Sequence, residues 1–149
     1  MKVLFLDIDG VICSIRSAVA YGGFPWTVKE KDMYLFDDVA IKLIQRLCKD
    51  TNTKIVLSSV WRLSHDWKMI GEKLNLPIID KTPNKLSSNR GEEIAMWLRD
   101  NKVDAYAIVD DDSDMLEEQL PFFVRVYSKN GLSFENYEQL MAILKKEDI

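Results

Sequence analysis

Apolar runs without polar alternation recur along the chain and predict strands that are buried on both faces, as in a parallel sheet. Two of the strongest runs end directly in carboxylates, and another ends in hydroxyl residues. Pro77 indicates an edge strand or a strand start for its run, because proline cannot donate to a sheet ladder. The expected strands are Val3–Leu6, Lys54–Ser59, Leu76–Ile79, Ala105–Val109 and Phe122–Tyr127.

Between these runs the apolar positions recur with helical spacing. Asp37 or Asp38 can cap the first of these helices, and Ser64 is a possible cap for the second. Asn89, followed three residues later by Glu92, resembles the capping box of a third helix. The apolar stripes are Phe36–Leu47, Leu63–Leu74, Ile94–Leu98 and Phe134–Leu144.

The alternation of strands and helices predicts a three-layer α/β fold with a mostly parallel, five-stranded sheet. In such sheets, ligands bind at the carboxyl ends of the strands. Residues 13–35 show no clean period and contain Gly22, Gly23 and Pro25, so we expect a long loop or small flap over that end. No repeat or linker divides the chain, and a single domain over 1–149 is expected.

Composition narrows the functional class. The 149 residues are 47% hydrophobic and 30% charged with a net charge of -4, which argues against non-specific duplex binding. No apolar run approaches the roughly 18 residues of a membrane span, and the first apolar stretch is too short for a secretory signal. A cytoplasmic protein is therefore expected. Cys13 and Cys48 have no metal-binding spacing and are expected to be buried, reduced thiols.

Carboxylates gather where two of the most apolar runs end. Asp7 and Asp9 lie two residues apart, so an extended chain would turn both toward one pocket. Asp110 and Asp111 close another run. If the two strands are neighbours, these four carboxylates would repel one another without a cation, and Mg²⁺ suits such an oxygen-rich site. The alternative is that the acidic residues only end strands and begin turns.

These segments resemble the haloacid dehalogenase (HAD) superfamily of phosphatases. Asp7–Val11 is similar to the first motif of that superfamily, Ile55–Ser59 to the second and Ala107–Asp111 to the fourth. The resemblance implies a Rossmann-like fold with a minimal cap, and a phosphatase that acts through an aspartyl-phosphate. It implies that Asp7 attacks phosphorus, that Asp9 is the general acid and base, that a second-motif hydroxyl binds the phosphoryl oxygens, and that fourth-motif acids hold Mg²⁺.

Two assignments stay open at the level of the sequence. The basic residue of the third motif is expected to be Arg90, which begins the helix before the fourth-motif strand, with Lys81 and Lys85 as competitors. Adjacent strand residues face opposite ways, so only one of Ser58 and Ser59 should enter the site, and Ser59 is favoured. The predicted catalytic residues are Asp7, Asp9, Ser59 and Arg90.

Within the superfamily, Ser59–Arg62, Arg90–Ile94 and the Asp110–Asp112 run resemble the small HAD domain of Swiss Army Knife RNA-repair proteins. They are also similar to the 3′-phosphatase half of phage polynucleotide kinases. Trp61 and Arg62 are interpreted as a stacking platform and a phosphate clamp, against the alternative of a half-buried aromatic and a surface ion pair. The predicted substrate-binding residues are Ser58, Trp61, Arg62 and Lys85, whereas His65 is expected at the surface without a catalytic role.

The chain leaves little length for a cap domain, so an open pocket is expected. Such a pocket could admit a nucleotide or the terminal phosphate of a nucleic acid. Trp61 and Arg62, Trp26 in the flap and the basic segment 81–90 could then hold the adjoining nucleotide by stacking and charge. The alternatives are a phosphatase for small metabolites and a non-catalytic HAD-like binding domain.

Overall fold

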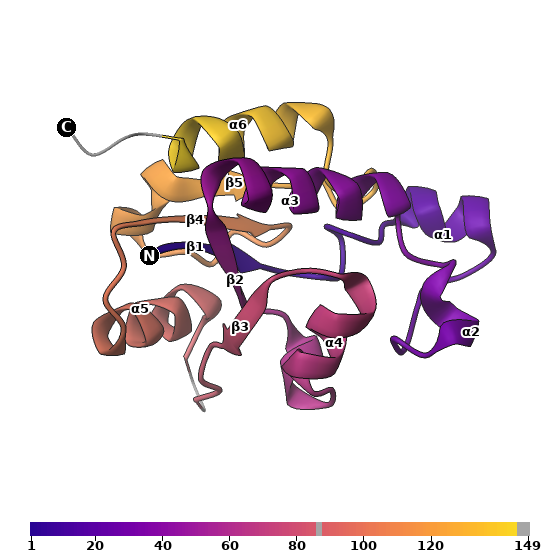
Figure 1. Ribbon diagram of the computed structural model, residues 1–149, viewed down its shortest axis with the longest axis horizontal. Coiled ribbons are helices and arrows are strands. Elements are labelled where there is room, and N and C mark those ends of the chain that lie inside the picture. Colours follow the sequence, from indigo (N-terminus) through magenta and orange to yellow (C-terminus); the bar gives the residue numbers. More distant parts are fainter. Residues whose placement is uncertain (86–87, 146–149) are drawn as a thin grey trace.

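A computed structural model describes residues 1–85 and 88–145. Its centre is a five-stranded, all-parallel sheet in the order β3-β2-β1-β4-β5 (Figure 1). The expected α/β fold is therefore confirmed. The strands are β1 (Lys2–Leu6), β2 (Thr53–Leu57), β3 (Ile78–Lys81), β4 (Ala105–Asp110) and β5 (Phe123–Arg125).

β1 lies at the middle of the sheet because its run of apolar residues can be buried on both faces. Leu6 pairs with Leu57 of β2 on one side and with Val109 of β4 on the other. The two strands that end in carboxylates are therefore neighbours, as the expected acidic cluster requires. β3 is an edge strand, as Pro77 indicated, and it begins at Ile78, just after the proline.

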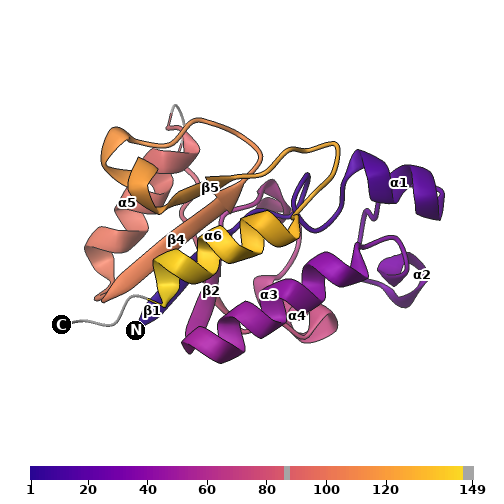
Figure 2. The same cartoon turned by 90° about the horizontal axis from the view of Figure 1, so that it is seen from above.

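Helices cover both faces of the sheet. α3 (Asp38–Thr51) and α6 (Phe134–Leu144) lie side by side on one face, and α5 (Arg90–Asp100) lies on the other (Figures 1 and 2). α4 (Trp67–Leu74) packs against β3. Asp37 caps α3 and Asn89 caps α5, as expected. The cap of α4 is Asp66 rather than Ser64, because a short 3₁₀ helix, η1 (Val60–Leu63), precedes it. A second 3₁₀ helix, η2 (Glu117–Phe122), leads into β5.

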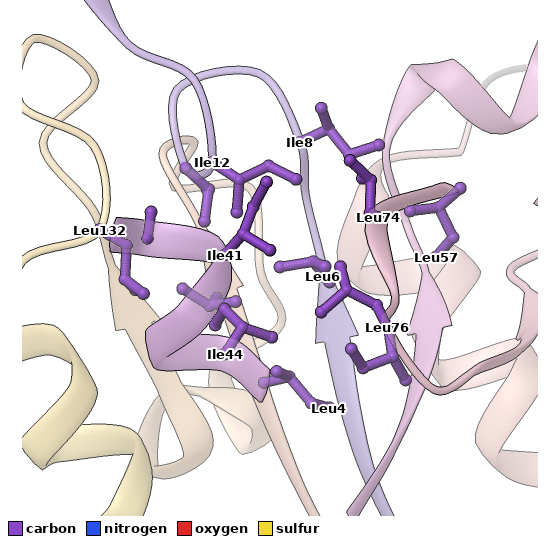
Figure 3. Close-up of a cluster of buried hydrophobic side chains, with 14 of the residues drawn as sticks. Leu4, Leu6, Ile8, Ile12, Ile41, Ile44, Leu57, Leu74, Leu76 and Leu132 are labelled. Carbon is purple, nitrogen blue, oxygen red and sulfur yellow. The ribbon is translucent and has the colours of Figure 1, made fainter. Parts of the chain in front are cut away.

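Alternation along β1 divides the core into two parts. Leu4 and Leu6 face α3 in the larger cluster, which Figure 3 shows around Ile41 and Ile44. Phe5 points to the opposite face and meets the ring of Trp97 of α5 edge-on, with 5.6 Å between ring centroids. The same alternation determines on which face of the sheet the side chains just past the end of the strand lie.

The segment expected as a loop or flap contains two short helices, α1 (Ile15–Tyr21) and α2 (Glu30–Met33). Ser14 caps α1 in a reciprocal capping box with Ser17, and Gly22 ends the helix in a left-handed conformation at φ 98°. The helical period is hidden in the sequence because α1 buries only two residues. The segment projects from the sheet on the side where the parallel strands end (Figure 1).

Two further expectations concern the chain as a whole. Cys13 and Cys48 are buried free thiols. Within residues 1–85 and 88–145, no helix has the length and apolar character needed to cross a bilayer.

Candidate active site

Three carboxylates meet at the carboxyl ends of β1 and β4. The N–H of Asp7 donates to the carbonyl of Val109 at 3.2 Å, which extends the β1–β4 pairing past the end of β1. Asp7 is 3% exposed and Asp110 is fully buried. Oxygen atoms of Asp7, Asp110 and Asp111 lie within 4.8 Å of one another. A divalent cation would fit this donor set, because hard carboxylate oxygens are its usual ligands.

Gly10 lets the first loop pass close to this group. Its φ of 83° lies in the left-handed region, and a Cβ at residue 10 would collide with the carboxylate of Asp111. A side chain at this position would therefore be disfavoured both by backbone strain and by contact with Asp111.

Arg90 supplies the positive charge of the site. It is the first residue of α5, and its Nη1 lies 3.3 Å from Asp7 Oδ2 and 2.5 Å from Asp110 Oδ2. Its backbone N–H donates to Asp114 Oδ2 at 3.0 Å. Among the residues described, neither Lys81 nor Lys85 forms an ion pair; both are exposed, and Lys85 lines a hollow outside α5 with Met96 and Arg99. The geometry thus brings Arg90 to the carboxylates and leaves the two lysines apart from them.

Burial and mutual repulsion shift the ionisation of the cluster. Burial, with the negative charge of Asp110 next to it, raises the pKa of Asp7 to about 9, although Arg90 acts in the opposite direction. Burial also raises the pKa of Asp110. The guanidinium of Arg90 is disfavoured by burial, but Asp7 and Asp110 outweigh that effect and hold its pKa above the usual range. One arginine therefore does not balance three carboxylates, and the imbalance favours a bound cation.

The two serines of the second motif have different environments. The N–H of Ser58 donates to the carbonyl of Leu6 at 3.0 Å, so Ser58 continues the β1–β2 pairing opposite Asp7. Val56 packs on the α5 face, so alternation places Ser58 on that face too. Its hydroxyl is buried and has no hydrogen-bond partner in the described part of the chain. Ser59 Oγ instead accepts the N–H of Trp61 at 3.2 Å and caps η1.

Asp9 does not join the three clustered carboxylates. It is exposed, and its Oδ1 accepts the indole N–H of Trp61 at 3.1 Å. The expected fourth carboxylate ligand is therefore held apart from the group that could bind a metal. Within residues 1–85 and 88–145, no hydrogen bond reaches its other oxygen, Oδ2.

Trp61 and Arg62 are both buried, which differs from the expected stacking platform and phosphate clamp. Trp61 is 6% exposed, and His65 stacks on it with ring centroids 4.7 Å apart. Arg62 is 4% exposed, and burial lowers its pKa. An arginine has five N–H donors, and Arg62 directs them at the carbonyls of Ser58, Ser59, Thr82 and Pro83 and at the carboxylate of Glu93.

The sequence offered no direct signal for Glu93, the carboxylate partner of Arg62. Glu93 lies 3.1 Å from Arg62 Nη2 although 31 residues separate them in the chain. Glu93 is on the buried side of α5. An acidic residue among the buried positions of a helix indicates that a basic partner lies opposite it, and this was the available signal in the sequence. Asp114 belongs to the same acidic run as Asp110 and fixes the start of α5 through the N–H of Arg90.

The family model for the HAD domain in Swiss Army Knife RNA repair proteins matches residues 3–137. No curated protein and no solved structure matches the chain significantly. The matched range includes every residue of the site described above.

Proposed function

The chain belongs to the family of HAD domains found in Swiss Army Knife RNA repair proteins, and from that premise we propose that it hydrolyses phosphate monoesters with Mg²⁺ as cofactor. The observation that carries the proposal is the arrangement around Asp7. The buried carboxylate of Asp7 is paired with Arg90 and lies beside two further carboxylates. On the same face of the sheet, the buried hydroxyl of Ser58 has no hydrogen-bond partner within residues 1–85 and 88–145. Such a hydroxyl is suited to donate to a bound phosphoryl oxygen.

The donor set fits Mg²⁺. Asp7, Asp110 and Asp111 offer only oxygen atoms, and their net negative charge is not balanced by Arg90. We infer that these three residues hold the ion, and that Asp9 would contribute only through its backbone carbonyl, because its side chain bonds Trp61. When bound, Mg²⁺ would supply charge neutralisation at the phosphoryl group, which is what allows an anionic nucleophile to approach it.

The protein groups then divide the chemistry between them. A carboxylate oxygen of Asp7 attacks phosphorus and forms an aspartyl-phosphate, while the bond to the leaving oxygen breaks. Asp9 in its acid form gives a proton to that oxygen. The resulting Asp9 carboxylate takes a proton from a water molecule, which attacks phosphorus and frees Asp7. Arg90 and Ser58 donate to the phosphoryl oxygens; this assigns to Ser58 the role first expected of Ser59.

We infer that the substrate is a nucleotide or the phosphorylated end of a nucleic acid. The family's link to RNA repair supports this, as do features of the site's rim. Trp26 in the flap is 77% exposed. A hollow of about 410 Å³ beside Asp111 is lined by Arg125 and Tyr127. Arg125 Nε donates to the Asp111 carbonyl at 3.4 Å, and the terminal guanidinium nitrogens have no partner among the described residues. An arginine beside an exposed ring suits a phosphodiester and its base.

The experiment is phosphate release by the full chain with Mg²⁺ on 3′- and 5′-phosphorylated oligoribonucleotides, nucleoside monophosphates, sugar phosphates and an aryl phosphate. We expect turnover of oligonucleotides at a higher kcat/KM than of sugar phosphates, and none with Asp7→Asn. Tyr127→Ala should raise KM for the oligonucleotide alone. Preference for sugar phosphates would instead indicate a metabolite phosphatase, and no turnover of any ester would indicate a binding domain.

A further inference from the structure

The Asp9 carboxylate has one strong hydrogen-bond donor in the described structure, the indole N–H of Trp61 at 3.1 Å from Oδ1. The thiol of Cys13, at 3.7 Å from the same oxygen, is the other polar hydrogen nearby, and thiols are weak donors. Asp9 is itself exposed and follows the strand end in the first loop. Without this bond, its side chain would rotate freely in solvent.

The indole that holds Asp9 is itself fixed on several sides. Trp61 lies in η1, where its backbone N–H donates to Ser59 Oγ and its backbone carbonyl accepts two backbone N–H groups. Phe36 packs against one part of its ring system, with centroids 5.8 Å apart, and His65 stacks on it at 4.7 Å. His65 Nε2 in turn lies 3.1 Å from the carbonyl of Trp26 in the flap. The direction of the indole N–H is thus set before any substrate binds.

We propose that Trp61 is a positioning residue for Asp9, and that it orients the carboxyl group for proton transfer in the hydrolysis proposed above, on which this inference rests. The indole nitrogen can only donate, so it fixes Oδ1 and leaves Oδ2 directed away as the oxygen that exchanges the proton. This hydrogen bond does not itself assist the attack of Asp7 on phosphorus or the binding of substrate. It acts on the two steps in which Asp9 gives and takes a proton.

This role has a kinetic signature that a packing role lacks. General acid catalysis matters when the leaving oxygen is basic, as in an alkyl or ribose phosphate. It matters little when the leaving group is 2,4-dinitrophenolate, which departs without a proton. Loss of orientation should therefore slow the first step for a ribose phosphate and leave the first step unchanged for 2,4-dinitrophenyl phosphate. General acid–base groups contribute about 10²–10⁴-fold, and we expect misorientation to remove about 10-fold or more of that.

The variant that tests this is Trp61→Phe, which keeps an aromatic ring and removes the N–H. We expect kcat for a nucleoside monophosphate to fall about 10-fold with KM little changed. The initial burst of dinitrophenol should keep its rate, followed by slower turnover because Asp9 also activates the water of the second step. Phe36→Leu is the matched control, since it loosens the packing of Trp61 and keeps the N–H. Phe36→Leu should lower Tm without altering the ratio of the first-step rates for the two substrates.

A double-mutant cycle with Asp9→Asn separates positioning from any independent effect of Trp61. In the Asp9→Asn background, Trp61→Phe should have no further effect on the ribose phosphate, because the group that it orients has been removed. Should Trp61→Phe not fold, replacement of Trp61 by 3-benzothienylalanine keeps the shape of the indole, lacks the donor and takes its place in each assay.

Equal losses in the rate of the first step for both substrates, or additive losses in the cycle, would overturn the positioning role while leaving the proposed phosphatase intact. Absence of turnover in the wild type, with every ester, would overturn the proposed function and this inference with it.

Discussion

Replacement of Asp7 by asparagine should make the metal-free protein more stable at neutral pH while it abolishes turnover. Burial and Asp110 raise the pKa of Asp7 from its ordinary 3.8 to about 9. Between these values the folded state binds a proton that the unfolded state has released. The free energy of unfolding therefore falls as the pH rises through this window. Asparagine does not titrate, so the variant should lose this dependence.

The magnitude follows from the gap between the unfolded pKa and the working pH. At pH 7 the gap is about three units, and at 1.36 kcal/mol per unit the folded protein gives up about 4 kcal/mol to keep the carboxyl neutral. The asparagine variant avoids that cost, but Arg90 Nη1 loses the carboxyl oxygen that lies 3.3 Å away. We therefore expect a net stabilisation of about 2–4 kcal/mol at pH 7, and a smaller one at pH 5.

The assay is urea unfolding in the presence of a chelator at pH 5, 6, 7 and 8, followed by circular dichroism. Wild type should lose stability across this range and Asp7→Asn should lose much less. Asp50→Asn, an exposed acid on α3, is the control for general charge effects and should follow the wild type. If wild type and Asp7→Asn showed the same pH slope, the buried carboxyl could not be the source of the instability.

Three further predictions test other parts of the site. Mg²⁺ should raise Tm by mass action, and its binding should release protons at pH 7 because Asp7 must ionise to bind the ion. Titration calorimetry in two buffers of different ionisation enthalpy measures this proton release. An equal heat of binding in both buffers would refute it. Arg62→Lys should lower the free energy of unfolding by about 3 kcal/mol with KM unchanged, because an ammonium has three donors in place of five and cannot serve Glu93 and four buried carbonyls together. A raised KM at full stability would instead support the phosphate-clamp role. Ser58→Ala should lower kcat/KM about 10-fold or more with little change in stability. Ser59→Ala should instead lower the free energy of unfolding by about 1 kcal/mol, because η1 loses its cap. The reverse pattern would return the catalytic role to Ser59.

Much of the fold is determined by local patterns in the sequence. The unbroken apolar run of β1 can be buried only at the middle of a sheet, and the carboxylates at its end and at the end of β4 then meet if the strands are neighbours. Asp37 and Asn89 cap helices as local chemistry predicts. These features depend on residues a few positions apart, so sequence spacing is enough to find them. In the flap, α1 escaped detection because its exposed positions carry the apolar side chains of Ile15, Val19 and Tyr21.

The placement of the second-motif side chains was decided only by the tertiary structure. Whether Ser58 or Ser59 faces Asp7 depends on where the strand's alternation stops, and the pairing with β1 carries it as far as Ser58. Arg62 is buried by partners that lie 20 to 31 residues further along the chain. Trp61 meets Asp9 across 52 residues. A side chain's spacing in sequence does not tell which distant donors and acceptors will surround it, because those contacts form only when the crossover connections bring the strand ends together.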